Sequence, residues 1–234
     1  MNLWKLFLGI LYPKTCCFCG KISEKELCDI CAKKVVYIKE PRCKKCGRPV
    51  RYQEQEFCGE CRKKAFNYEQ GRSIWLHKEP VSTSLYRFKY HNRRIYGEFY
   101  AKELYRLYGK KIKEWKIDVI IPVPLHKKRR RVRGYNQAEI IAKELGKLAV
   151  VSVDTKSVFR KKYTAPQKEL NDKQRKQNLK DAFAIQKNAK LGRNILLVDD
   201  IYTTGSTIDT IAQLLLKNGA GKVCFFTISI GQDF

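Results

Sequence analysis

The strongest chemical signal in this 234-residue chain is ILLVDDIYTTGST, residues 195–207. Its first four residues form an apolar run that is typical of a strand inside a parallel sheet. Two adjacent carboxylates, Asp199 and Asp200, follow at the C-terminal end of this strand, where open α/β sheets bind their ligands. Five small residues then lead into a periodic helix over 208–216 and offer hydroxyl and N–H groups: Thr203, Thr204, Gly205, Ser206 and Thr207.

The acidic pair and the loop 203–207 suit different chemical groups, so together they predict a ligand that carries both kinds of group. The free N–H groups of a helix N-terminus bind phosphate. Carboxylates do not bind phosphate directly, but they suit sugar hydroxyls or a magnesium ion that is held indirectly. A phosphorylated sugar therefore fits both. The alternative is a plain strand-to-helix turn in which Thr and Ser cap the helix and Gly205 is the pivot.

The whole stretch resembles the phosphoribosyl-diphosphate (PRPP) signature of type I phosphoribosyltransferases: an apolar strand, two acids, two variable residues and TTGST. The resemblance implies an α/β fold with a mainly parallel sheet flanked by helices. It also implies that Asp199 and Asp200 hold the ribose 2′ and 3′ hydroxyls, that residues 203–207 hold the 5′-phosphate, and that magnesium accompanies PRPP. The P-loop and GxGxxG patterns are both absent from the sequence, so nucleoside-triphosphate and dinucleotide sites gain no support.

Cysteine spacing is the second signal, because eight of the ten cysteines form four CxxC pairs. These are Cys16, Cys19, Cys28, Cys31, Cys43, Cys46, Cys58 and Cys61. Two residues between cysteines let both thiolates face one tetrahedral ion, and two pairs complete a four-cysteine zinc site. The spacing therefore predicts two structural zinc ions. We favour sequential pairing, first pair with second and third with fourth, although an interleaved arrangement uses the same residues.

Other uses of the cysteines are less favoured. Nothing in the sequence indicates secretion, which argues against disulfides. Four repeats fit a region too small for its own core better than they fit a single redox CxxC. Cys17 is expected to be a bystander, and Cys224 is expected to pack in a strand as a small hydrophobic residue.

The length allows one α/β domain and a small additional module. We expect an N-terminal helix and a double zinc ribbon over residues 1–66, with a phosphoribosyltransferase-like domain over 67–234. Residues 3–12 are apolar but too few to span a membrane, and we expect a helix docked on the main domain. The sequence shows no targeting signal, which favours the cytoplasm and agrees with reduced thiolates.

The formal net charge of +26 is more than solubility requires, and both the first 64 residues and the remainder are basic. Such an excess favours polyanions: nucleic acid, a phosphorylated substrate or an anionic membrane surface. A lysine-rich composition with solvated faces is the alternative. Aromatic and basic residues alternate over 86–94, as base stacking with phosphate contacts requires, but burial of one helix face, with Leu85, Phe88 and Tyr96, explains much of the pattern equally well. The three histidines, His77, His91 and His126, show no metal-ligand spacing.

Alternating strand and helix patterns position these motifs on a parallel sheet. We expect strands over 71–76, 118–123, 150–153, 182–185, 195–198 and 223–230. We expect helices over 80–109 with a break near residue 91, over 135–148 and over 206–217. The polar stretch 159–180 is expected to be a mobile flap with a short helix.

A basic segment after the second expected strand extends the resemblance. Residues 122–138, PVPLHKKRRRVRGYNQA, place six cations in the seven residues 127–133. This order resembles the ComF family of competence-associated phosphoribosyltransferase-like proteins. In type I enzymes the loop after this strand holds the pyrophosphate group of PRPP. The resemblance therefore implies that role for Val123, Pro124, Leu125, Arg129 and Arg133.

The flap also resembles the flexible-loop region of that family, which has a characteristic set of spaced residues. The matching positions are Arg160, Thr164, Gln167, Arg175, Asn178, Ala182 and Phe183. Arg160 and Gln167 would then contribute to PRPP binding, and a closing flap would exclude water. The terminal GQDF and the N-terminal CxxC ribbon match the family as well.

The family resemblance implies a cytoplasmic protein that binds PRPP with magnesium and also single-stranded DNA, acting in DNA uptake and transformation with DNA-uptake or recombination proteins. Phosphoribosyl transfer requires positioning and preorganised charge, which assigns the catalytic part to Asp199, Asp200, Arg129 and Arg133. One alternative is a metabolic phosphoribosyltransferase acting on a base or amine. Another is a non-catalytic zinc-ribbon adaptor for nucleic acid. No residue identifies the acceptor.

Overall fold

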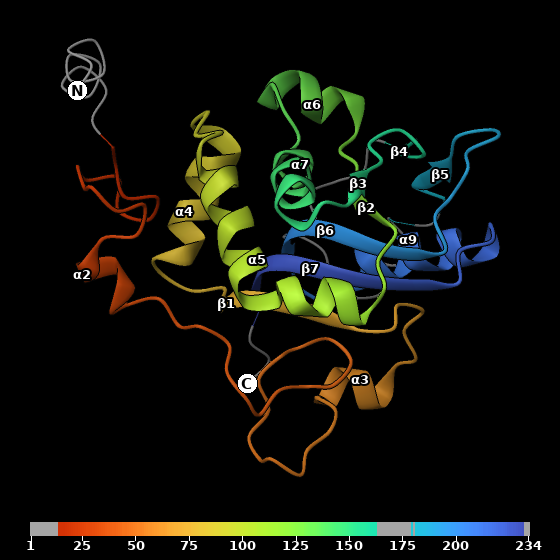
Figure 1. Ribbon diagram of the computed structural model, residues 1–234, viewed down its shortest axis with the longest axis horizontal. Helices are drawn as coiled ribbons and strands as arrows, with labels where there is room; N and C mark the ends of the chain where they lie inside the picture. Colours follow the sequence, from red (N-terminus) through yellow and green to blue (C-terminus); the bar gives the residue numbers. More distant parts are fainter. Residues whose placement is uncertain (1–13, 163–178, 180, 232–234) are drawn as a thin grey trace.

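The computed structural model describes residues 14–162, 179 and 181–231. Its central sheet has five strands: β1 (Gly71–Leu76), β2 (Val119–Pro122), β3 (Ser152–Val153), β6 (Asn194–Tyr202) and β7 (Lys222–Ile230). Their order is β1-β7-β6-β2-β3, and every neighbouring pair is parallel (Figure 1). The expected α/β fold with a mainly parallel sheet is confirmed.

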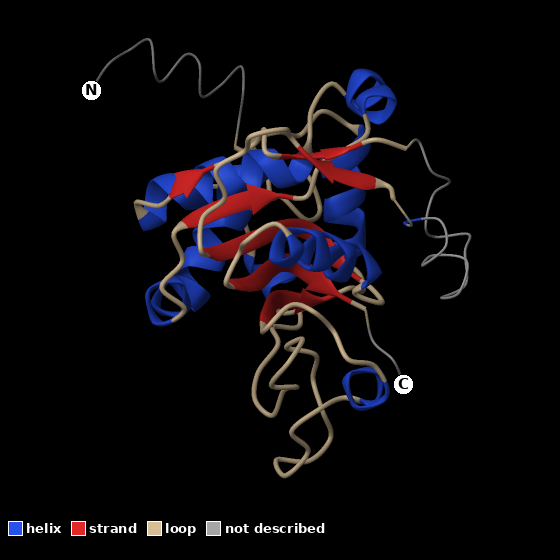
Figure 2. Ribbon diagram, turned by 90° about the vertical axis from the view of Figure 1, so that its right-hand side faces the viewer, coloured by secondary structure: helices blue, strands red, loops and turns tan. Residues whose placement is uncertain are grey.

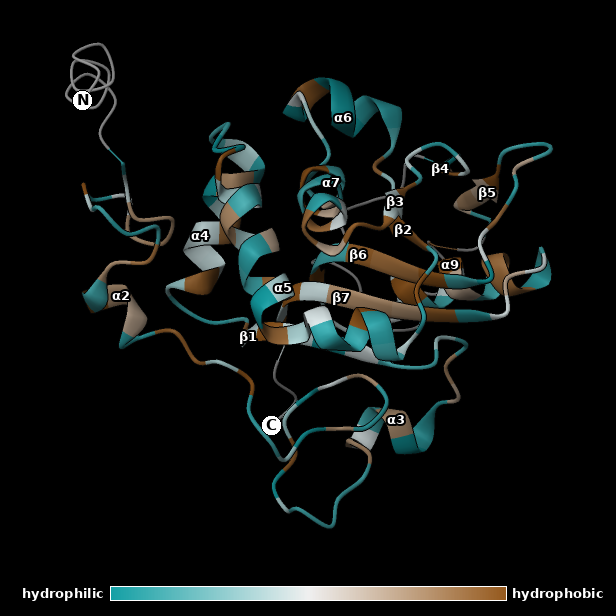
Figure 3. Cartoon of the chain, in the orientation of Figure 1, coloured by the Kyte–Doolittle hydropathy of each residue, from teal (hydrophilic) through white to brown (hydrophobic). Residues whose placement is uncertain are grey.

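Helices cover both faces of this sheet. Three of them, α4 (Val81–Tyr90), α5 (Tyr96–Glu114) and α7 (Gln137–Ala149), share one hydrophobic core, and α9 (Ser206–Lys217) packs in a second core. Alternation along β6 separates the cores, because Leu196 and Val198 enter the first while Ile195 and Leu197 enter the second. The central part of each strand that is buried on both faces is therefore apolar over several consecutive residues, as the brown stretches of β6 and β7 show in Figure 3.

The acidic pair lies within β6 rather than after it, which corrects the expected end of this strand near residue 198. Asp199 is still in register with Thr227 of β7, because β7 is equally long. On the other side of β6 the ladder with β2 ends where Pro122 faces Val198. The acidic pair therefore lies beyond the end of β2, on the open side of β6.

Two further segments differ from expectation. The basic segment expected as a loop is a short helix, α6 (Lys127–Arg133), because the His126 ring accepts a hydrogen bond from the N–H of Lys128 and Gly134 ends the helix at φ 79°. The strand expected near 182–185, β5 (Phe183–Ile185), does not join the parallel sheet. It pairs antiparallel with β4 (Val158–Arg160) in a separate two-stranded ribbon at the two ends of the expected flap.

The two cysteine-rich ribbons pack on different cores. The first, with the short helix α2 (Asp29–Ala32), contributes Cys16 and Cys31 to the core beneath α4 and α5. The second, with α3 (Gly59–Lys63), contributes Cys43, Cys46 and Cys58 to the core shared with α9. Figure 2 shows the second ribbon as loops beside the sheet, with α3 as its short helix.

The segment that joins the ribbons protects the edge of the sheet. Its residues 36–38 run antiparallel to β1: the N–H of Ile38 donates to the carbonyl of Ile74, and the N–H of Leu76 donates to the carbonyl of Val36. The helix expected over 3–12 lies outside the described residues. Among the residues that are described, no helix has the length and apolar character needed to cross a membrane.

Candidate functional site

A cavity of about 480 Å³ opens where β2 ends and β6 continues. It is lined by most of the residues that the sequence singled out: Val123, Pro124, Leu125, Arg129, Arg133, Arg160, Asp199, Asp200, Thr203, Gly205, Ser206 and Thr207. Thr204 is not part of the lining, and its hydroxyl lies 2.9 Å from that of Ser206. Gln167, Thr164, Arg175 and Asn178 lie outside the described residues. The structure thus brings together segments that are separated by tens of residues in the chain.

The acidic pair is enclosed by protein on most sides. The N–H of Asp200 donates to Oδ1 of Asp199 at 2.8 Å, and Nζ of Lys89 lies 3.0 Å from Oδ1 of Asp200. Both side chains of this ion pair are largely buried, at 18% exposure for Lys89 and 14% for Asp200. Burial and the charge of Asp200 raise the pKa of Asp199 to about 7. The cavity therefore holds a carboxyl group, that of Asp199, whose ionised form lacks the hydration it would have in water.

Because its pKa is raised, ionised Asp199 destabilises the folded state, and we expect Asp199→Asn to raise the free energy of unfolding by ~2–4 kcal/mol above neutral pH. An unfolded aspartate titrates near ~4, whereas folded Asp199 titrates at about 7. Between these values the folded state binds the extra proton, so the contribution of Asp199 to stability falls as pH rises through this window. Thermal melting should show a large gain in Tm for the variant near pH ~8 and a small one near pH ~5. Equal gains at both pH values would contradict the assignment.

The loop after β6 presents a helix N-terminus to the cavity. The helix α9 begins at Ser206 with Gly205 as its N-cap, in the left-handed region at φ 79°. The capping residue therefore has no side chain, which differs from the plain turn in which Thr or Ser caps the helix. The first N–H groups of an α-helix have no acceptor within the helix, and the helix dipole adds positive charge there. This end of α9 is suited to a phosphate group.

Cations form the facing wall. Arg160 on β4 and Arg129 on α6 both line the cavity, and burial together with the charge of Arg129 lowers the pKa of Arg160 to about 10. A guanidinium group whose pKa is lowered by a neighbouring guanidinium in this way favours the binding of an anion between the two. The guanidinium of Arg133 donates to Oε1 of Gln137 at 2.7 Å and lies 5.0 Å from the ring centroid of Tyr90. The wall can therefore accept a multiply charged anion.

Several lining residues were not assigned to the site from the sequence. They come mainly from α4, with one residue directly after β1 and the N-cap residue of α7: His77, Ser82, Leu85, Tyr86, Lys89, Tyr90 and Asn136. The only signal at sequence level was the alternation of aromatic and basic residues over 86–94. That pattern did not show that Lys89 pairs with Asp200, because the two are far apart in the chain.

Each cysteine group has the geometry of a four-thiolate metal site. The sulfur atoms of Cys16, Cys19, Cys28 and Cys31 lie within 4.8 Å of one another, and so do those of Cys43, Cys46, Cys58 and Cys61. This confirms sequential pairing over the interleaved alternative. The Sγ atoms are 3.8 Å apart between Cys19 and Cys28, and 3.7 Å apart between Cys46 and Cys58. A tetrahedron with zinc–sulfur bonds of about 2.3 Å has edges of about 3.8 Å, whereas a disulfide requires about 2.05 Å.

The remaining two cysteines behave as expected from the sequence. Cys17 belongs to neither group, and burial raises the pKa of its thiol to about 12. Cys224 is fully buried in β7, where burial raises its pKa to about 11. Both thiols therefore stay protonated at neutral pH. The donor set of the two groups, four sulfurs each, suits zinc.

The fold and the composition of the cavity define a phosphoribosyltransferase-type domain that carries a double zinc ribbon. The family description "Double zinc ribbon domain" matches residues 7–62, and "Phosphoribosyl transferase domain" matches residues 96–229. A purine phosphoribosyltransferase from Pyrococcus horikoshii is similar over 56% of this chain and 83% of its own, at 18% identity and a TM-score of 0.37.

Three curated proteins are similar to this chain at higher sequence identity and over most of their length. Competence protein F from Haemophilus influenzae is 36% identical over 207 residues, covering 86% of this chain and 89% of its own. The DNA utilization protein YhgH of Shigella flexneri is 31% identical over 217 residues, with 90% and 94% covered. Competence protein ComFC of Bacillus subtilis is 28% identical over 218 residues, with 88% and 84% covered. The chain belongs to the ComF family.

Proposed function

We propose that this protein binds PRPP with magnesium in the cavity between β2 and β6, binds single-stranded DNA on the adjoining surface, and acts in competence and DNA uptake. The cavity carries the proposal, because it joins an acidic pair, a helix N-terminus and several cations in one space of about 480 Å³. The relatives named competence and DNA utilization proteins support the biological process. The proposed setting is the cytoplasm, with DNA-uptake or recombination proteins as partners.

Each part of PRPP has a matching part of the cavity in this proposal. Asp199 and Asp200 accept hydrogen bonds from the ribose hydroxyls, and the loop 203–207 binds the 5′-phosphate through N–H and hydroxyl groups. The residues after β2, together with Arg129 and Arg133, bind the pyrophosphate. Magnesium, when bound, neutralises the negative charge that develops on the departing pyrophosphate. The protein then contributes position and preorganised charge. Gln167 remains a prediction from its place in the sequence.

Isothermal calorimetry with PRPP tests the ligand. We expect saturable binding at one site per chain in the presence of magnesium, and much weaker binding when magnesium is left out of the buffer; EDTA is not used because it would also remove zinc. Absence of binding with magnesium present would refute the PRPP assignment and favour a nucleic-acid adaptor. Release of pyrophosphate with a free base or amine as acceptor would instead favour a metabolic transferase.

The edge of the cavity that α4 forms supports the DNA part of the proposal. Tyr86 and Tyr90 are one helical turn apart on α4, are 54% and 60% exposed, and have ring centroids 4.9 Å apart. His91 continues this tyrosine strip, with its ring 5.6 Å from that of Tyr86. Exposed aromatic rings beside cations are the arrangement that stacks bases and holds the backbone of single strands. The nearby helix α6 supplies six cations and no acid.

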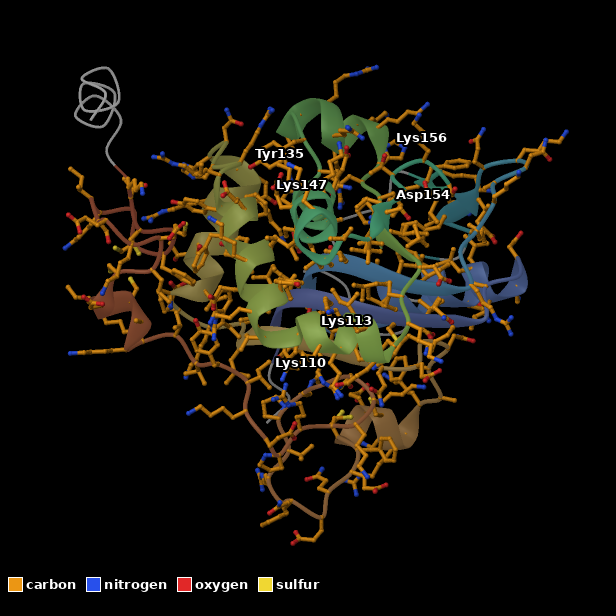
Figure 4. All side chains as sticks on the ribbon, viewed as in Figure 1. Lys110, Lys113, Tyr135, Lys147, Asp154 and Lys156 are labelled. Carbon is orange, nitrogen blue, oxygen red and sulfur yellow. The ribbon has the colours of Figure 1, made fainter. Side chains whose placement is uncertain are left out.

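Basic side chains are not confined to this strip. Figure 4 shows nitrogen-tipped side chains projecting from many parts of the molecule, including Lys110 and Lys113 on α5, Lys147 on α7 and Lys156. A charge of +26 spread in this way attracts DNA without sequence preference. Exposed aromatic rings, which can stack on unpaired bases, are therefore the feature that distinguishes a site for single-stranded DNA from nonspecific electrostatic attraction.

Replacing Tyr86 and Tyr90 together by alanine is expected to weaken binding of a labelled oligothymidine about 10-fold to 100-fold, because stacking contributes ~1–3 kcal/mol per base. Fluorescence anisotropy measures this, with Tyr52→Ala as the matched control because Tyr52 is equally exposed, at 66%, on the second zinc ribbon. Affinity should also fall as salt is raised. Unchanged affinity in the double variant would remove the strip from the binding surface.

A further inference from the structure

Arg48 connects the second zinc ribbon directly to the phosphate-binding loop. It lies two residues after Cys46, is only 4% exposed, and donates a hydrogen bond from Nη2 to the carbonyl oxygen of Thr203 at 2.7 Å. The partners are 155 residues apart in the sequence. A buried guanidinium requires polar partners, so this contact is a fixed part of the structure rather than a chance encounter of surface side chains.

The turn of residues 43–48, which carries Cys43 and Cys46, determines where Arg48 lies. The N–H of Cys43 donates to the carbonyl of Arg48 at 2.7 Å, and the N–H of Gly47 donates to the carbonyl of Cys43 at 3.0 Å. Gly47 has φ +76°, and a Cβ there would lie 2.6 Å from the carbonyl oxygen of Gly71. The backbone of residues 43–48 therefore packs closely against the start of β1. The backbone of Arg48 cannot shift without displacing Cys43 and Cys46 as well.

The loop is supported from the same side by a pair of tyrosines. The hydroxyls of Tyr68 and Tyr202 are 2.6 Å apart, and both residues share a hydrophobic core with Cys43, Cys46 and Cys58. A Cβ on Gly205 would lie 2.4 Å from the Tyr202 hydroxyl, so the loop backbone rests directly on that ring. Tyr202 itself is stacked on Phe225, at 4.9 Å between centroids and 3° between planes.

These contacts act on the loop backbone at Thr203, which lines the cavity, and at the peptide that follows it. In a trans peptide the N–H of Thr204 points opposite to the carbonyl of Thr203, so holding the carbonyl also fixes the direction of that donor. Zinc would hold the four thiolates of this site together, so its loss would remove the fold of the turn that places Arg48.

We propose that the second zinc centre, acting through Arg48, is a positioning element of the phosphate-binding loop. Zinc at Cys43, Cys46, Cys58 and Cys61 then does more than fold the ribbon, because it holds the loop 203–207 in its binding conformation. The part that concerns ligand affinity rests on the proposed function. The part that concerns loop order does not depend on which phosphate compound binds.

Hydrogen–deuterium exchange of the zinc-loaded full chain tests the positioning role without a ligand. Arg48→Met keeps most of the aliphatic stem and removes the donor, and we expect exchange in the peptide spanning 203–207 to accelerate about 10-fold. Arg48→Lys retains a charge and should restore part of the protection. Arg51→Ala, at an exposed arginine of the same ribbon, should leave the peptide unchanged. Zinc analysis should give two ions per chain for every variant.

Calorimetry with PRPP and magnesium provides the second readout. We expect Arg48→Met to raise the Kd about 10-fold to 100-fold, with Arg48→Lys in between and Arg51→Ala close to the unsubstituted protein. If the unsubstituted protein shows no PRPP binding, the proposed function is wrong, and exchange still decides the role of Arg48. Unchanged exchange in Arg48→Met would overturn the inference, and so would a loss of zinc that accounts for all of the change.

Discussion

Replacing Asp199 and Asp200 together by asparagine should lower the affinity for PRPP at least 100-fold. Each carboxylate can accept two hydrogen bonds from ribose hydroxyls, and charge-assisted hydrogen bonds contribute ~1.5–3 kcal/mol each. Asparagine retains the shape but loses the charge and one acceptor. Isothermal calorimetry in magnesium at about pH 8, above the pKa of about 7 for Asp199, measures the full difference.

A matched control separates loss of binding from loss of fold. Asp29→Asn removes an exposed carboxylate on the first ribbon and should leave PRPP affinity unchanged. Two effects on the stability of the double variant oppose each other: the repulsion between the carboxylates is relieved, but the largely buried Lys89 loses its ion-pair partner Asp200. Thermal melting must therefore show that the variant is folded at the temperature of the calorimetry. A double variant that folds and still binds PRPP with normal affinity would show that the acidic pair does not hold the ribose.

The second large effect is expected from Cys46→Ser. Cys46 is 1% exposed and its sulfur lies 3.7 Å from that of Cys58, so serine removes one of four ligands from a closed site. Structural zinc contributes ~10–16 kcal/mol of apparent binding energy, which is also folding energy for a ribbon without a large core of its own. We expect metal analysis to fall from two zinc ions to one per chain, and Tm to fall by more than ~10 °C.

Cys17→Ser is the control for this substitution, because Cys17 is equally buried, at 3% exposure, but belongs to neither cysteine group. It should retain two zinc ions per chain. If Arg48 positions the loop 203–207, we expect Cys46→Ser to weaken PRPP binding as well, because Cys46 lies two residues from that arginine. Retention of two zinc ions by Cys46→Ser would refute the assignment of the second centre.

The chemical groups of the site were predictable from sequence because each motif is local. The DD and TTGST residues lie within nine consecutive positions, so one strand and one helix start are enough to place them. CxxC spacing likewise brings two thiolates to one ion without any tertiary contact. The order of strands and helices followed from hydrophobic periodicity, and the all-parallel main sheet agrees with it.

Long-range pairing was not predictable in the same way. The extension of β6 through Asp199 depends on the length of β7, which lies more than twenty residues away. The ion pair between Lys89 and Asp200, and the hydrogen bond between Arg48 and Thr203, join residues from different elements. A single sequence contains no periodic or spacing signal for such contacts, because they depend on how whole elements pack.

By itself the sequence determined which groups are present at the candidate site and at the two cysteine sites, since the acidic pair, the TTGST residues and the CxxC pairs lie in short motifs. The tertiary structure alone decided that the cysteine pairs combine sequentially, that the two ribbons pack on different cores, and that Arg48 of the second ribbon contacts the loop 203–207. The physical reason is that motif chemistry is set by neighbours along the chain. The support of the loop depends instead on the burial of Arg48 and Tyr202 between two distant segments.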